Sequence, residues 1–285
     1  MHDSLSRFLF TLGIHLFGCG QDLIRIVKIG RITLSYGHPH DLDAIIEVFI
    51  FDVYGIRRIP RSAVVFDLGS GIGDFAIAVA NRIGPKGTVF AIEPNPKDFQ
   101  LLSQNLTANK LANDVAENVA LSSSHNPLSL SFKDSSFTAY TRSLKTILER
   151  AGLSIQEVSR RPIVLKLDIE GAEAQTLIDL ERILSSVLRV AIEMHGTKER
   201  IDEFLIPKGF TFTRLTRRSY LSKLLLFFLR HPLSSIVILR HFREVSGSLG
   251  LKRLLSGIEI TSSTDLVVGV YLKQRPPSAT DAQFQ

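Results

Sequence analysis

Two periodicities of hydrophobic and polar positions alternate along the chain, and their order predicts the fold class. Short apolar runs such as residues 64–67 and 163–168 end at acidic residues or glycines, which is typical of buried strands. Stretches such as residues 72–83 and 172–185 instead carry apolar residues at helical spacing. Strands that alternate with helices predict a doubly wound, mostly parallel α/β sheet. We expect seven strands in this sheet.

The expected elements can be placed along the chain from these patterns. The strands are expected at residues 64–67, 88–93, 115–121, 163–168, 190–193, 211–215 and 265–272, with a short extra strand at 128–132. The helices between them are expected at residues 72–83, 96–109, 144–151, 172–185 and 201–208. The last two strands are expected to form the antiparallel pair that closes the sheet.

Additions surround this core in the predicted domain organisation. The parts are an N-terminal cap over residues 1–60, a core over 61–215, an insertion over 216–259, the last core strand within 260–273 and a disordered tail over 274–285. The cap is expected to contain a helix over about residues 1–20, a strand–turn–strand over 23–35 and a helix over 41–54. A signal peptide is the alternative for the first segment, but Asp3 and His15 fit poorly in a signal peptide.

Composition narrows the class of protein and its compartment. The chain has 285 residues, of which 45% are hydrophobic and 22% are charged, as in ordinary globular proteins. It contains one cysteine, Cys19, which excludes a disulfide framework within the chain and a cysteine-rich metal site. We therefore expect a cytoplasmic protein.

The positive charge is concentrated in one segment. Residues 208–253 carry +9, so the remaining chain carries −3 of the net +6. The basic pI of 9.5 therefore does not indicate a general nucleic-acid surface, and aromatic residues for base stacking are few. The apolar runs 224–229 and 233–239 are shorter than the roughly 20 residues of a spanning helix. The basic residues around them suit peripheral contact of residues 217–243 with an anionic inner membrane face; a helical pair packed on the domain is the alternative.

A glycine-rich turn follows the first core strand and is the most informative chemical feature. Gly69, Gly71 and Gly73 stand at alternate positions before a helix. Such a turn lets a ligand approach the backbone, and the amides at the helix start favour electron-rich groups. Glu93 ends the next strand, where a carboxylate suits the two hydroxyls of a ribose. The two features together indicate a nucleoside-containing ligand.

The loop favours one class of nucleoside. Asp74 stands where the dinucleotide pattern needs its last glycine, and no glycine–lysine–Ser/Thr triplet closes a P-loop. Asp67 would repel a pyrophosphate but suits the sulfonium and ammonium groups of S-adenosylmethionine. The residues expected to bind this cofactor are Asp67, Gly69, Ser70, Gly71, Gly73, Glu93 and Asp168.

Two further blocks resemble a known family. Residues 163–173 resemble the K-x-D-x-E-G-x-E signature of FkbM-type methyltransferases, and residues 190–196 resemble the E-x-H strand end that follows it. The resemblance covers about residues 47–215. It implies a class I methyltransferase fold and O-methylation of a hydroxyl on a sugar, glycolipid or secondary metabolite. One departure is Lys145, where the family often carries aspartate.

The candidate catalytic residues follow the fourth and fifth core strands. They are Asp168, His195, Glu193 and Lys166. A base within hydrogen-bond reach assists transfer to an alcohol, and a histidine can accept a proton near neutrality. Lys166 lies in a buried strand and needs a partner, for which Asp168 and Glu193 are the candidates. The carboxylates Glu170 and Glu173 are better explained by the start of the next helix.

Two alternatives remain beside this interpretation. An Asp/Glu/His set could also hold a divalent metal, but no tight ligand spacing supports one and none is expected. The competing functional class is a methyltransferase-fold protein without activity that serves as a membrane-associated or adaptor module. The intact glycine loop and Glu93 argue against loss of cofactor binding.

Overall fold

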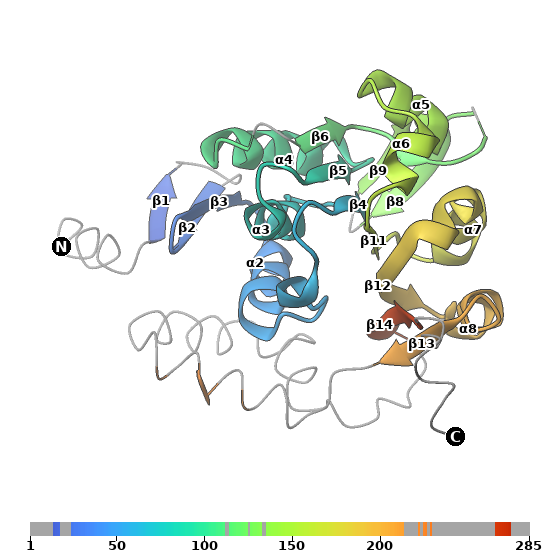
Figure 1. The fold of residues 1–285 in the computed structure, drawn as a ribbon. Coiled ribbons are helices and arrows are strands. Elements are labelled where there is room, and N and C mark those ends of the chain that lie inside the picture. The colour runs from blue at the N-terminus through green and yellow to red at the C-terminus, as the bar shows by residue number, and fades with distance from the viewer. Residues whose placement is uncertain are drawn as a thin grey trace, which may run out of the picture.

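A seven-stranded sheet is the centre of the computed structural model (Figure 1). The structure describes residues 14–17, 24–111, 114–124, 126–132, 135–213 and 266–274, and the separate positions 222, 225, 226 and 229. The strands follow the order β13-β14-β12-β11-β4-β5-β6. All neighbouring pairs from β12 to β6 are parallel, whereas β14 is antiparallel to both β12 and β13. The predicted doubly wound, mostly parallel sheet is therefore confirmed.

The elements of this sheet have the following bounds. The strands are β4 (Val64–Leu68), β5 (Thr88–Ile92), β6 (Asp114–Glu117), β11 (Ile163–Leu167), β12 (Val187–His195), β13 (Phe210–Thr213) and β14 (Leu266–Lys273). The helices are α2 (Pro39–Ile46), α3 (Asp74–Ile83), α4 (Pro96–Ala108), α5 (Leu144–Arg150), α6 (Ile155–Ser159), α7 (Glu173–Asp179) and α8 (Lys198–Leu205). The additional strands are β1 (Ile14–Phe17), β2 (Ile24–Ile29), β3 (Ile32–Tyr36), β7 (Ala120–Leu121), β8 (Leu128–Phe132), β9 (Ser135–Ala139) and β10 (Thr141–Arg142).

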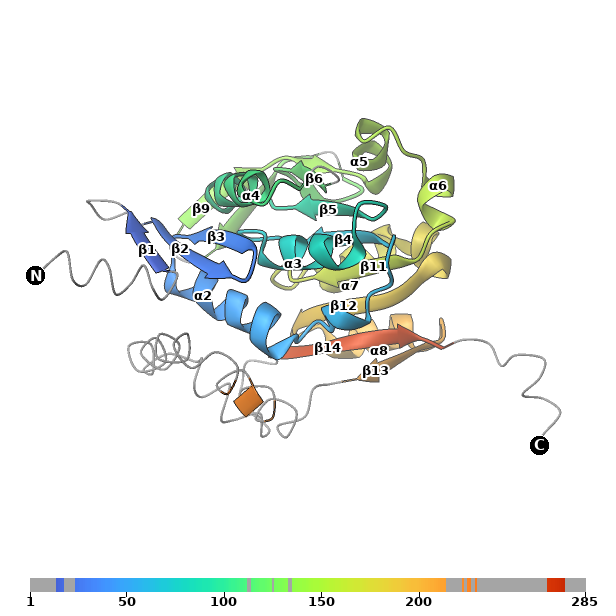
Figure 2. The same cartoon turned by 60° about the vertical axis from the view of Figure 1, so that its left-hand side comes forward.

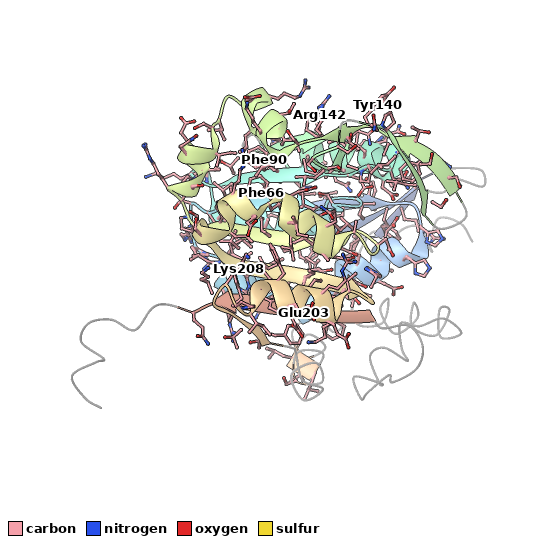
Figure 3. The ribbon with its side chains drawn as sticks, turned by 90° about the vertical axis from the view of Figure 1, so that its right-hand side faces the viewer. Phe66, Phe90, Tyr140, Arg142, Glu203 and Lys208 are labelled. Atoms are coloured by element: carbon pink, nitrogen blue, oxygen red, sulfur yellow. The ribbon has the colours of Figure 1, made fainter. Side chains whose placement is uncertain are left out.

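Helices cover both faces of the sheet, which explains why its central strands are apolar throughout. Every residue of β4 and β11 is buried. Successive side chains of a strand point to opposite faces, so Val65 packs with α2 and α3 while Val64 and Phe66 pack with α5, α7 and α8. Phe66 stacks on Phe90 with 4.9 Å between ring centroids, and Figure 3 looks onto this face with both residues labelled.

Capping residues fix where several helices begin. Asn95 accepts a hydrogen bond from Lys97 N and precedes Pro96 at the first position of α4. Ser154 forms a capping box with Glu157 at the start of α6. These local signals fix the first residues of α4 and α6.

The N-terminal additions are joined to the core by side-chain amides of α4. Asn105 is fully buried and accepts a hydrogen bond from Ser35 N at 2.6 Å, while its amide donates to Ser35 O at 2.9 Å. Asn109 exchanges the same two kinds of bond with Thr33. The two asparagines thus pair the outer edge of β3 as a neighbouring strand would, and Figure 2 shows β3 beside α4.

The cap differs from the prediction in its first segment. The predicted strand–turn–strand is confirmed as β2 and β3, and the predicted helix over 41–54 is confirmed as α2 with a π-helical turn, η1 (Glu47–Phe51). The helix expected over about residues 1–20 is wrong at Ile14–Phe17, which form β1 and pair antiparallel with β2. These four residues satisfy either periodicity, and the edge of β2 decides between them. Residues 1–13 and 18–23 lie outside the described part of the chain.

Other boundaries differ because side-chain contacts intervene. The strand expected over 115–121 ends at Glu117, which pairs with Arg142 and Arg150. The next residue, Asn118, donates to Glu93 O and Pro94 O and draws the chain off the sheet. The extra strand expected at 128–132 is present as β8 and pairs with β9. The sequence analysis did not predict β9 or α6. The strand expected at 190–193 extends over the whole of β12.

The predicted insertion and tail cannot be compared with the structure in the same way. Residues 216–259 lie outside the described residues except for 222, 225, 226 and 229, and so do residues 275–285. Among the described residues, no helix has both the length and the apolar character needed to cross a membrane.

Candidate active site

The glycine turn after β4 makes a backbone arrangement that only glycine fits at its first position. Gly69 has φ +75°, and a Cβ atom there would lie 1.8 Å from the carbonyl oxygen of Asp168. The turn is therefore held against the end of β11. Gly71 also has a positive φ, +52°, but a Cβ there would meet nothing within 4 Å. The space beside Gly71 is the open side of the turn, from which a ligand can approach the backbone.

The remaining loop residues have structural partners as well. A Cβ at Gly73 would lie 2.5 Å from Leu102 Cδ1, so close packing with α4 explains this glycine. Ser70 is buried, and its hydroxyl donates to Asp67 O within the turn. Contact of Gly73 and Ser70 with a cofactor stays a prediction.

Glu93 joins the glycine turn to the end of β5. Its carboxylate accepts hydrogen bonds from Gly71 N at 2.8 Å and from Asn95 N at 2.7 Å. Burial raises the pKa of Glu93 to about 8, although the two amide bonds act to lower it. The structure thus brings together the two features that predicted a nucleoside site, although they lie 22 residues apart.

Lys166 lies at the centre of the site, between β4 and β11. Its Nζ is 3.3 Å from Asp67 Oδ1 and 3.7 Å from Asp168 Oδ2, and it donates to Gly69 O at 2.5 Å. The predicted pairing of Lys166 with Asp168 is confirmed. The nearer partner, Asp67, was missed, because nothing in the sequence shows that residues 67 and 166 face each other across paired strands.

The charges around Lys166 determine its protonation. Burial by itself lowers the pKa of Lys166, but the carboxylates of Asp67, Asp168 and Asp74 outweigh it and raise the pKa above its ordinary value. Lys166 is therefore a cation at neutral pH and cannot accept a proton. Burial raises the pKa of Asp67, which Lys166 opposes, and raises that of Asp74 to about 7. Carboxylates outnumber the lysine here, so the site favours a cationic ligand.

Two buried residues near Lys166 were not predicted as parts of the site. The ring of Tyr54 lies 5.7 Å from Lys166 Nζ, and burial raises the pKa of its hydroxyl well above the ordinary value. Asp74 is buried at the start of α3. Tyr54 comes from the N-terminal cap, and no motif in the sequence connects it with β11.

Asp67 is the predicted cofactor residue whose setting differs most from the expectation. Its side chain has no exposed surface, and neither carboxylate oxygen has an aligned hydrogen bond within the described residues. The 3.3 Å ion pair with Lys166 balances its charge from inside the protein. A direct contact with a sulfonium stays a prediction, and the geometry gives Asp67 the role of holding Lys166.

His195 ends β12 and is held by a buried carboxylate. Its Nδ1 is 2.9 Å from Glu173 Oε1, and Glu173 has no exposed surface. The carboxylate of Glu173 also accepts hydrogen bonds from Gly171 N at 2.8 Å and Thr197 Oγ1 at 2.9 Å. Glu173 was expected to act only at a helix start, so sequence reasoning missed its contact with His195. The E-x-H strand end together with the last Glu of the preceding signature was the available signal.

The surroundings of His195 raise its affinity for a proton. Burial lowers the pKa of His195, but the hydrogen bond to Glu173 and the charges of Glu170 and Glu193 raise it to about 9. Its Nε2 lies 3.3 Å from Glu170 Oε2 and 3.9 Å from Glu193 Oε1. In this arrangement His195 is an imidazolium at neutral pH, so it can act as a base only after losing that proton.

Asp168, Glu193 and His195 come together at the ends of β11 and β12. One side-chain ligand atom from each lies within 4.8 Å of the others, a spacing that could hold a metal ion. The three residues are parts of the predicted catalytic set, and Lys166 contacts this group through Asp168. The candidate residues therefore gather along one rim, next to the glycine turn.

The chain matches one protein family over more than half of its length. The family described as "Methyltransferase FkbM domain" matches residues 67–229. Methyltransferase sdnD of Sordaria araneosa is 27% identical over 211 residues, covering 59% of this chain and 81% of that protein. Hexuronic acid methyltransferase AglP of Haloferax volcanii is 32% identical over 149 residues, covering 50% of this chain and 59% of that protein.

The chain is also similar, at low sequence identity, to solved structures. TYW2 of M. jannaschii in complex with AdoMet is 17% identical, with a TM-score of 0.39 over 70% of this chain and 82% of that one. A SAM-dependent methyltransferase from Aquifex aeolicus is 16% identical, with a TM-score of 0.37 over 62% and 89%.

Removal of the buried lysine should expose the cost of an unpaired charge. We predict that Lys166→Met lowers the free energy of unfolding by about 3–5 kcal/mol, because Asp67 then stays buried without its partner. Lys145→Met removes an exposed ion pair with Glu149 and should change the free energy of unfolding by less than about 0.5 kcal/mol. Denaturant unfolding measures both values. Equal stability of Lys166→Met and wild type would show that Asp67 does not hold a charge in the interior.

The raised pKa of His195 predicts a pH dependence of stability. The folded-state pKa of about 9 exceeds the ordinary 6.5, so the protonated pair stabilises the fold fully below about pH 6.5 and this stabilisation is lost as the pH rises through about 9. We expect a loss of no more than about 3 kcal/mol across this window. Unfolding in urea with a metal chelator present should show it in wild type and not in His195→Gln. A decline of the same size in both proteins would assign it to other groups.

Proposed function

Because the chain belongs to the FkbM methyltransferase family and is an S-adenosylmethionine-dependent methyltransferase, we propose that it methylates a hydroxyl oxygen of a sugar, glycolipid or secondary metabolite. Binding of the cofactor is supported by the hydrogen bond that Gly71 N donates to the Glu93 carboxylate, beside the open side of the glycine turn. The hydroxyl acceptor is supported by the similarity to a hexuronic acid methyltransferase.

The cofactor would lie along the glycine turn in this proposal. Glu93 would face the ribose hydroxyls, and the backbone at Gly69 and Gly71 would contact the amino-acid part. The carboxylates around Lys166 favour the sulfonium and the ammonium of S-adenosylmethionine, because they outnumber the buried lysine. Asp168 lies at the end of β11 with its side chain about one-third exposed, so it can face the ligand.

The reaction requires an attacking oxygen and a proton acceptor. S-adenosylmethionine held at the glycine turn would supply a methyl group to the acceptor oxygen, and its sulfur would keep the electron pair of the broken carbon–sulfur bond as a neutral thioether. The hydroxyl proton needs a base within hydrogen-bond reach. Asp168 is the residue we assign to this role, because Lys166 is cationic and His195 holds a proton at neutral pH. His195 and Glu193 would orient the acceptor.

The competing class, a methyltransferase-fold adaptor without activity, is not favoured. The described site keeps the glycine turn, Glu93 and the carboxylates at the strand ends. Contact of residues 217–243 with an anionic membrane, and a place at its cytoplasmic face, remain part of the proposal and rest on the sequence. They would bring the enzyme to a lipid-linked acceptor.

Cofactor binding tests the first part of the proposal. Calorimetry with S-adenosylhomocysteine should show one site per chain in wild type. Gly71→Val fills the open side of the turn, and Glu93→Ala removes the carboxylate that would accept hydrogen bonds from the ribose hydroxyls. Each substitution should abolish or greatly weaken binding of S-adenosylhomocysteine. Lys145→Met serves as the exposed control and should bind as wild type does. Tight binding of NAD without binding of S-adenosylhomocysteine would overturn the cofactor assignment.

Turnover tests the assignment of the base. With a uronic acid glycoside as the first acceptor screened, Asp168→Asn should lower the rate roughly 10²–10⁴-fold, with the affinity for S-adenosylhomocysteine nearly unchanged. His195→Ala should lower it as well, through loss of positioning. Methyl transfer from labelled S-adenosylmethionine measures the rate. A wild-type rate in Asp168→Asn would show that positioning alone drives the transfer or that another residue is the base.

A further inference from the structure

We propose that Asp168, Glu193 and His195 bind a divalent cation of the Mg²⁺/Mn²⁺ type, which holds the acceptor through two of its oxygens. The proposal rests on the proposed methyl transfer for the role of the ion, whereas binding of the ion itself can be measured without any transfer. The three residues lie at the ends of two adjacent parallel strands, β11 and β12.

The spacing of the ligand atoms suits a single ion. One nitrogen or carboxylate oxygen from each residue lies within 4.8 Å of the other two. Ligands bound at about 2.1 Å from one ion are at most about 4.2 Å apart, so side-chain rotations would complete the set. Glu193 and His195 are two residues apart on β12 and therefore point to the same face.

The orientation of His195 is an independent observation that points to a metal. Its Nδ1 is held by Glu173, a fully buried carboxylate that is itself fixed by Gly171 N and Thr197 Oγ1. This contact aims Nε2 at the carboxylates of Glu170, at 3.3 Å, and Glu193, at 3.9 Å. A carboxylate behind one ring nitrogen, with the other nitrogen free to bind an ion, is the usual second contact of a metal-binding histidine.

The charges of the site leave room for a divalent ion. Glu170, Glu173 and Glu193 all lie within 4 Å of the His195 ring nitrogens. One imidazolium balances one of these three carboxylates, and a divalent ion in its place would balance two. The two carboxylates suit Mg²⁺ or Mn²⁺, and the imidazole favours the transition metal of the two, Mn²⁺. Glu170 is more than half exposed, so it can turn away from Nε2 when an ion binds.

The bound ion would determine which acceptors fit. Three protein ligands leave open positions on an ion that prefers six. Two adjacent oxygens, from a vicinal diol or from a hydroxyl beside a carboxylate, could occupy two of them. The ion would orient the acceptor and lower the pKa of the bound hydroxyl. Asp168 offers one oxygen to the ion, so the proton would leave to its other carboxylate oxygen. The preferred acceptor would therefore offer two oxygens to the ion, and an acceptor with a lone hydroxyl would be disfavoured.

Mn²⁺ binding to the full chain without an affinity tag tests this site. The electron paramagnetic resonance signal of free Mn²⁺ should disappear up to one equivalent per chain, and Mg²⁺ should compete. His195→Gln and Glu193→Gln should weaken binding at least about tenfold, and Glu173→Gln should weaken it about 10–100-fold, as loss of a second contact does. Glu149→Gln removes an exposed carboxylate far along the chain and should bind as wild type does.

The outcomes separate this proposal from the proposed function. Electron spin-echo measurements on wild type should show a nitrogen coupled to Mn²⁺, and this readout needs no variant to fold. Absence of stoichiometric binding, absence of a coupled nitrogen, or wild-type affinity in both His195→Gln and Glu193→Gln would overturn the metal site. Calorimetry with S-adenosylhomocysteine in the presence of a chelator reports on the methyltransferase site alone.

Discussion

The ion pair between Lys166 and Asp67 is the constraint on which the rest of the site depends. Both side chains are buried, and they join the two central strands, β4 and β11, next to the start of the glycine turn. Lys166 also binds the carbonyl oxygen of Gly69. A buried charge without its partner is costly, so the pair fixes the register of the two strand ends and the position of the turn together. Glu93 then attaches to a turn that is already placed.

The second half of the site is built differently. Around His195 the partners range from the fully buried Glu173 to Glu170, which is more than half exposed. The buried carboxylate fixes the ring, and the exposed one can move. Carboxylates outnumber cations in both halves among the described residues, which favours positively charged ligands. A cationic cofactor and, as we propose, a divalent ion would each neutralise one half.

Local patterns in the sequence were enough for most of the fold and for part of the site. Apolar runs and helical spacing placed the sheet, and the residues that follow its strands, Gly71, Glu93, Asp168 and His195, were predicted as parts of the site. Contacts between distant segments were not predictable from periodicity. The pairing of Asp67 with Lys166 needs the strand order, and the approach of Tyr54 needs the path of the cap. The strand at Ile14–Phe17 was missed because a helix and an edge strand suit the same four residues.

The site residues at the sheet edge differ in how deeply they are buried. Asp67 and Glu173 have no exposed surface, and each holds a residue of the site through a contact inside the protein. The side chains they support, Lys166 at 5% and His195 at 22%, are more exposed, and the side chain of Asp168, which pairs with Lys166, reaches 31%. Groups that stay in the interior can hold their geometry without a ligand, because their partners are part of the fold. Groups at the surface keep unsatisfied capacity for a ligand. The same sheet edge therefore provides a rigid inner layer of charges and an outer layer that can respond to cofactor and acceptor.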